Sequence, residues 1–179
     1  MVDIAGRVGA SFQPLESVAP SWHYGLSRFG ESITDWRPIW TAILEDYKIS
    51  EAALFSSEGS SGGERWMDLT PAYSAWKEAV NPGKQILYFS GLLRNAATNP
   101  RVIMTEDHMT LKIDDSGPYS YSNSKGTVHR TKKATAAFHH FGRGMVPERK
   151  VIQFPEAQIR RWQKIIQTLL VAQRSGGTT

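Results

Sequence analysis

The chain has 179 residues, of which 40% are hydrophobic, and it contains six Trp, six Tyr and seven Phe. This length suits a single domain, and the aromatic content excludes a disordered chain. There is no cysteine, which excludes disulfides, thiolate nucleophiles and Cys-ligated metals. No segment approaches the about 20 apolar residues of a membrane span, and residues 1–9 lack the apolar core of a secretory signal. We therefore expect no membrane contact, and a protein that stays in the compartment where it is made.

Charge is distributed unevenly along the chain. The formal net charge is +4, but residues 125–164 hold ten Lys or Arg against Glu148 and Glu156, a local balance of +8 that leaves −4 for the remainder. This basic region is interpreted in three ways: a solvated face, a patch for nucleic acid, or a contact with the acidic part of a neighbouring subunit.

Residues 1–33 show no sustained periodicity, because glycine and proline interrupt them repeatedly. They are predicted to form an N-terminal arm or irregular lead-in, followed by one domain over residues 34–174 and a flexible tail over 175–179. Large apolar side chains in the arm, among them Trp22 and Phe29, need a surface to cover. That surface is either the core of the same subunit or a groove on a partner.

The domain opens with two predicted helices. Apolar residues recur at helical spacing over residues 34–55, where Thr34 or Asp35 is a candidate cap. A flexible Ser/Gly loop follows over residues 56–64, and its spacing matches no phosphate-binding pattern. The second helix is expected over residues 70–80, with a proline in its first turn.

The second half of the domain is predicted to contain strands as well as helices. The expected elements are a short helix over 90–97, a β-hairpin of strands 102–105 and 108–113, a loop or irregular extension of the sheet over 119–133, a helix over 134–141, a strand over 149–154, and a final helix from Pro155. Together they indicate an α+β fold. A small antiparallel sheet packs against helices, including long N-terminal and C-terminal ones, and the domain carries an extended arm and loop.

Candidate catalytic groups do not form a recognisable pattern. Adjacent helical residues such as His139 and His140 point about 100° apart and rarely bind one metal, so we interpret both as packed or interface residues. The carboxylate pairs 106–107 and 114–115 stand where turns need Asp. No nucleophile-elbow pattern occurs. We therefore expect no enzyme, cofactor or metal.

A nucleic-acid-binding module is the alternative function. Basic residues that could contact phosphates include Arg130, Lys132 and Lys133, but no helix-turn-helix, zinc-finger or RNA-recognition pattern accompanies them.

Four short motifs occur in a fixed order over residues 34–170. The first reads W–x–x–L–[ST]–P–x–Y–x–x–x–K and is formed by Trp66, Leu69, Thr70, Pro71, Tyr73 and Lys77. The second reads IL–x–x–[ST]–G–x–L and is formed by Ile86, Leu87, Ser90, Gly91 and Leu93. The third reads A–x–x–H–[QH]–x–G and is formed by Ala136, His139, His140 and Gly142. The fourth, P–x–R, is formed by Pro147 and Arg149 and precedes the last helix.

This combination resembles the phage virion morphogenesis (tail-completion) family of tailed bacteriophages. The resemblance implies a structural virion protein that forms a homo-oligomeric ring at the head–tail interface, completing the tail and joining it to the head. A hexamer is favoured because tails are sixfold, and a dodecamer would match the portal. The implied partners are other copies, neighbouring neck proteins (adaptor or stopper) and the tail-tube protein. Genomic DNA would pass through the ring without sequence-specific contacts.

The implied location is the virion neck or tail, and the host cytoplasm during assembly. Contacts between neighbours are expected from the arm and from residues 117–133. The candidate interface residues are Trp22, Phe29, Arg130, Lys132 and Lys133.

Overall fold

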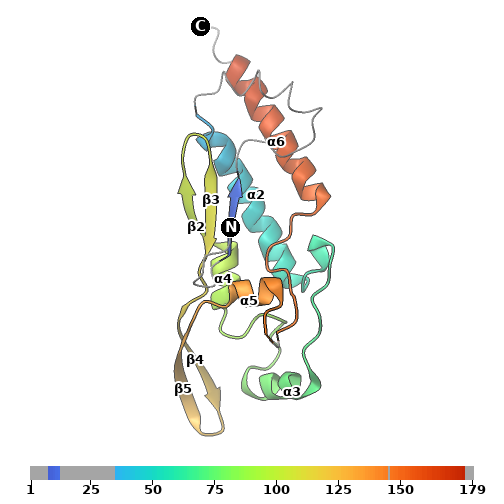
Figure 1. Cartoon of the computed structure of the whole chain (residues 1–179), viewed down its shortest axis with the longest axis vertical. Helices are drawn as coiled ribbons and strands as arrows, with labels where there is room; N and C mark the ends of the chain where they lie inside the picture. The colour runs from blue at the N-terminus through green and yellow to red at the C-terminus, as the bar shows by residue number, and fades with distance from the viewer. Residues whose placement is uncertain (1–7, 13–34, 145, 176–179) are drawn as a thin grey trace.

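The computed structural model describes residues 8–12, 35–144 and 146–175. The architecture is α+β, with a small antiparallel sheet and packed helices, as the sequence predicted. In chain order the elements are β1 (Val8–Phe12), α2 (Arg37–Ser56), the 3-10 turn η1 (Ser60–Gly62), α3 (Pro71–Val80), α4 (Leu92–Thr98), β2 (Arg101–Met104), β3 (Met109–Ile113), β4 (Gly117–Asn123), β5 (Gly126–Lys132), α5 (Ala136–Phe141) and α6 (Glu156–Ser175). The molecule is elongated, with α2 and α6 in one half and α3 and the β4–β5 hairpin at the opposite end (Figure 1).

The two long helices confirm the predicted periodicity. One stripe of α2 is buried, from Ile39 to Phe55, and Asp35 accepts a hydrogen bond from the backbone N–H of Arg37 at 2.9 Å, next to the start of the helix. In α6 the stripe buries Trp162 and Ile166, each 8% exposed. None of the helices in the described ranges is long and apolar enough to cross a membrane.

The core lies between these helices and a three-stranded antiparallel sheet of order β1-β3-β2. The central strand β3 buries Met109, Leu111 and Ile113 completely. Its neighbours are β2, the predicted hairpin partner, and β1, which lies within the arm for which the sequence predicted no regular structure. The edge of β3 therefore recruits a segment that has no periodicity of its own.

Residues 119–133 were predicted to be a loop or irregular extension, and this prediction was wrong. Residues 119–132 belong to a regular two-stranded antiparallel hairpin, β4–β5, in which Tyr119 pairs with Arg130 and Tyr121 with Val128. Tyr alternates with Ser in β4, which is the period-2 pattern of a strand. The segment has few apolar residues, so a prediction from hydrophobicity misses it. Contacts between β4 and α3 support the hairpin.

The predicted strand over residues 149–154 was also wrong. The backbone of this segment bonds outside any ladder: Arg149 N donates to the His139 carbonyl at 2.7 Å, and the Lys150 carbonyl accepts from Trp66 Nε1 at 2.9 Å. Because these groups are already bonded to α5 and to the Trp66 side chain, the segment follows an irregular path although half of its residues are apolar.

Candidate functional site

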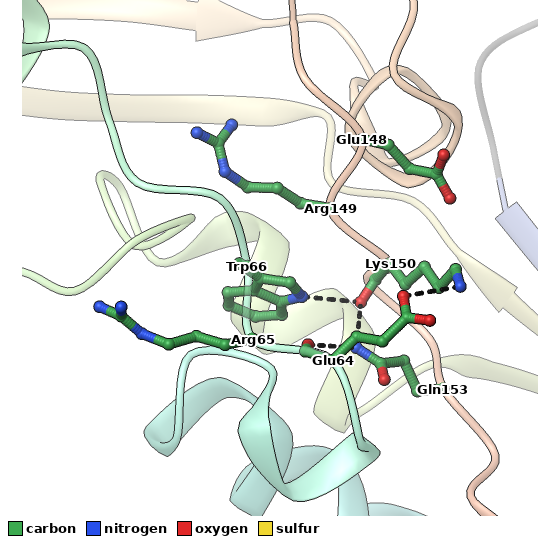
Figure 2. Close-up of a pocket in the computed structure, with 7 residues that line it drawn as sticks. All are labelled: Glu64, Arg65, Trp66, Glu148, Arg149, Lys150 and Gln153. Atoms are coloured by element: carbon green, nitrogen blue, oxygen red, sulfur yellow. Dashed lines mark hydrogen bonds and ion pairs between the residues drawn. The ribbon is translucent and has the colours of Figure 1, made fainter.

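Trp66 joins two loops that are far apart in the sequence. Its side chain is 3% exposed and meets Phe55 edge to face, with ring centroids 5.1 Å apart. Its Nε1 donates to the Lys150 carbonyl, and Lys150 Nζ pairs with Glu64 Oε2 at 2.7 Å (Figure 2). The carboxamide of Gln153 donates to the Glu64 carbonyl at 3.2 Å. Trp66 therefore fixes residues 64–69 against residues 148–153.

The buried side chain of Arg149 also joins these two loops. The side chain is 5% exposed, and its guanidinium donates to the Met67 carbonyl at 2.8 Å and to the Asp68 carbonyl at 3.1 Å. Burial lowers the pKa of Arg149 from its ordinary value, but a guanidinium stays protonated. The charge is thus used to bind backbone carbonyls.

Lys77 of α3 is a second buried cation that binds backbone carbonyls. It is the one buried residue of that helix, 5% exposed, and its Nζ donates to the carbonyls of Lys84, at 2.9 Å, and Gln85. Burial lowers the pKa of Lys77, while the carboxylate of Glu58 acts in the opposite direction. Lys77 therefore anchors α3 to the loop that follows it.

The third and fourth motifs lie at the end of α5. Burial, reinforced by the charges of Lys132 and Arg149, lowers the pKa of His139 to about 4, so this ring is neutral at pH 7. Burial also lowers the pKa of His140, whose ring packs edge to face on Phe141. Neither histidine meets a metal-binding arrangement: within the described ranges no group of three or more His, Cys, Asp or Glu could hold a metal ion.

Gly142 explains the glycine of the third motif. Its φ is +61°, in the left-handed region, and a Cβ there would lie 2.7 Å from the Glu148 backbone nitrogen. The half-buried Pro147 precedes that contact, so the turn after α5 closes tightly on the segment that carries Arg149.

The remaining motif residues pack or shape the backbone. Ile86 and Leu93 are buried, Leu69 and Leu87 are half-buried against the core, Pro71 starts α3, and Gly91, with φ of +82°, precedes α4. The motif residues between positions 66 and 149 therefore mainly hold loops in place. We call the loops that Trp66, Lys77 and Arg149 join the framework.

The pocket between these loops is lined by polar groups that mostly bond to one another. It measures about 290 Å³ and is lined by Glu64, Arg65, Trp66, Glu148, Arg149, Lys150 and Gln153. Figure 2 shows the polar groups of Glu64, Lys150 and Gln153 bonded to one another and to backbone atoms. Lys150 and Arg149 hold the two loops together, whereas Arg65 pairs with Glu58 and Asp68.

A second feature, which the sequence analysis missed, is an aromatic cluster at the far end of the molecule. Trp76 of α3 stacks on Phe89 at 5.4 Å between ring centroids, and Phe89 meets Tyr121 at 5.5 Å and Tyr119 at 6.0 Å. Tyr73 lies 5.4 Å from Trp76. We call these five rings the aromatic cluster. The Tyr-Ser alternation of β4 was the signal that could have revealed it.

The aromatic cluster is only partly covered. Tyr73 and Trp76 remain 45% and 44% exposed, although Trp76 packs against Phe89 and Tyr121. Large rings gathered in one place with this exposure are typical of interaction surfaces.

The candidate interface residues are placed unequally. Arg130 and Lys133 are exposed on or next to β5. Lys132 is half-buried and forms an ion pair with Asp115, which also accepts hydrogen bonds from the Thr135 and Ala136 backbone at the start of α5. Trp22 and Phe29 lie outside the described residues.

No family model matches this chain, and no curated protein sequence or solved structure is significantly similar to it.

Proposed function

We propose that this chain is a structural subunit that assembles with copies of itself into a ring at the head–tail interface of a tailed phage. The observation that carries the proposal is the aromatic cluster. Helix α3 buries a single side chain, that of Lys77, and presents Tyr73 and Trp76 half exposed. In water such a surface is unfavourable, and aromatic side chains anchor protein interfaces.

The framework described above supports the same proposal. Backbone carbonyls of neighbouring loops accept hydrogen bonds from the side chains of Trp66, Lys77 and Arg149. These bonds hold the loops and α3 in a defined position. A rigid surface loses less conformational entropy when it binds than a flexible one does. The proposal assigns no catalytic residue, cofactor or metal.

A ring is built from heterologous contacts, in which one face of each copy meets a different face of the next. The resemblance of the motifs to tail-completion proteins favours six copies, with twelve as the alternative, and places the ring in the virion neck or tail. Its neighbours would be the adaptor or stopper on one side and the tail tube on the other, with DNA passing through the ring.

Nucleic-acid binding is the second candidate, and one observation favours it. Residues 117–133, which include the β4–β5 hairpin, carry four Lys or Arg and no Asp or Glu. A module that binds phosphates would retain DNA in a gel-shift assay with a steep dependence on salt, whereas a joining protein would show little retention.

Electron microscopy tests the proposal directly. We expect rings in images of the purified protein, and heads and tails that remain unjoined in lysates of a phage lacking this gene. A monomer at every concentration, together with joined particles in its absence, would reject the proposed function.

A further inference from the structure

Two hairpins point in opposite directions along the long axis of the molecule. Figure 1 shows β2–β3 directed toward the end that holds α6 and β4–β5 directed away from it, past α3. The two hairpin tips therefore lie on different parts of the surface, as the two sides of a head-to-tail contact must.

The β4–β5 hairpin is basic and incompletely packed. Its two tyrosines belong to the aromatic cluster, while the opposite face, which includes Ser120, Ser122 and His129, is exposed. The side chains of Lys125 and Arg130 are exposed, and within the described part of the chain no carboxylate pairs with them. A two-stranded hairpin is marginally stable by itself, so further contacts would stabilise it.

The β2–β3 turn has the opposite charge. Asp35, Glu106 and Asp107 lie close together there, because the Trp36 backbone N–H donates to the Glu106 carbonyl at 2.9 Å. Their side chains are 38%, 68% and 79% exposed, in that order. We call these three residues the acidic turn.

The carboxylates of the acidic turn outnumber their cations. Arg37 is shared between Asp35, at 2.8 Å, and Glu106, at 3.8 Å, while Asp107 meets a histidine ring. Three other carboxylates have a cation of their own: Glu45 has Lys48 at 2.8 Å, Asp46 has Arg161 at 2.9 Å, and Glu64 has Lys150 at 2.7 Å. Arg65, like Arg37, is shared, between Glu58 at 3.6 Å and Asp68 at 3.1 Å. The acidic turn therefore keeps negative charge available to a cation from outside.

We propose that the β4–β5 hairpin, with the aromatic cluster beside it, docks on the acidic turn of a second copy of this chain. The inference rests on the proposed ring function and identifies the two faces that meet in it. Complementary charge sets the register and speeds the encounter, and the half-exposed rings of Tyr73 and Trp76 supply apolar area at the contact. Because both faces belong to every copy and lie apart, the contact repeats from one subunit to the next.

A charge-swap experiment tests this pairing. One variant, K125E/R130E, makes the hairpin acidic, and another, E106K/D107K, makes the turn basic. Each variant alone brings like charges together, so we expect its apparent dissociation constant for assembly to rise at least about tenfold in analytical ultracentrifugation. In an equimolar mixture each acidic hairpin meets a basic turn and each wild-type hairpin a wild-type turn, so rings with an even number of subunits re-form.

Matched controls separate docking from folding and from net charge. R143E/K164E reverses two exposed cations elsewhere on the molecule and is expected to assemble like the wild type. Thermal unfolding checks each variant. E106K alone replaces the double variant if the lost bonds of Asp107 to Thr105 and His108 unfold the turn.

The outcomes are distinguishable. Assembly of the mixture but of neither variant alone supports the pairing. If wild type and both variants assemble equally, or if the mixture stays monomeric, the pairing is wrong while the ring proposal stands. A wild type that never assembles rejects the pairing, and together with joined particles in its absence it also rejects the ring proposal. If K125E/R130E abolishes DNA retention and leaves assembly intact, the hairpin is a nucleic-acid surface and the docking inference fails.

Discussion

Glu51 lies on α2 within the apolar core. Its side chain is 2% exposed, and Oε1 has no hydrogen-bond partner within the described part of the chain. Burial raises the pKa of Glu51 well above its ordinary value. The folded protein therefore binds a proton that the unfolded chain releases, so this residue lowers the free energy of unfolding as pH rises above the unfolded pKa.

Replacing Glu51 by Gln removes that dependence. We expect E51Q to match the wild type at pH 4 and to be more stable at pH 8, with the gap widening by up to about 1.4 kcal/mol for each pH unit between the two pKa values. Urea denaturation at several pH values measures it. Glu45→Gln on the same helix is the control, because that side chain is 63% exposed and should show no such trend. Equal effects at both pH values would contradict the interpretation.

Two buried tryptophans differ in a way that isolates one hydrogen bond. Trp66 donates from Nε1 to the Lys150 carbonyl, whereas Nε1 of Trp40 has no partner among the described residues, although Trp40 is also 3% exposed. Replacing either by Phe removes similar volume, but only W66F takes a donor from a carbonyl, which keeps just the longer bond from Gln153 Nε2 at 3.5 Å.

We therefore expect W66F to destabilise the protein by about 1–2 kcal/mol more than W40F does. Equilibrium unfolding in urea provides both values. If W40F costs as much as W66F, the bond between the two loops contributes nothing measurable.

At the scale of elements, the β4–β5 hairpin depends on its neighbours. Tyr121 contacts Phe89 and Trp76, and these rings connect the hairpin to α3. Its own cross-strand bonds are those of a two-stranded ribbon, which is marginal in water. We therefore expect the packing of the aromatic cluster to stabilise the hairpin.

Y121A is expected to raise amide exchange rates in β4 and β5 by about tenfold or more while leaving β2 and β3 protected, because local opening of a weakly packed unit does not require global unfolding. Hydrogen exchange with mass spectrometry detects this. S122A, on the exposed face of the same strand, is the matched control. Uniform loss of protection across both sheets would show that the hairpin and the core unfold as one unit.

At the scale of the whole molecule, the proposed ring also involves the N-terminal arm. If Trp22 and Phe29 cover a groove on a neighbour, W22A/F29A lowers ring formation in size-exclusion chromatography while the circular-dichroism spectrum is retained. If the two rings belong to the core of their own subunit, the variant loses thermal stability at an unchanged elution volume. The two readouts distinguish the two surfaces that the sequence left open.

The sequence by itself determined the helices, the first hairpin and the α+β class. The stripe from Ile39 to Phe55, the proline at the start of α3 and the turn at Glu106-Asp107 are local signals, and each acts within a few residues of the structure it specifies. The four motifs remain a prediction of a functional group of residues, and their spacing gave no indication of what they bind.

Only the tertiary structure decided the path of residues 149–154, the regular β4–β5 hairpin and the aromatic cluster. Trp66 and Lys150 are 84 positions apart, and Arg149 and Met67 are 82 apart, yet each pair shares a hydrogen bond. The bonds that Trp66 makes to the Lys150 carbonyl and that Arg149 N makes to the His139 carbonyl override local strand propensity, because a backbone group already bonded elsewhere is not available to a ladder. Tyr119 and Tyr121 become a cluster for the same reason: their partners, Trp76 and Phe89, reach them only through folding.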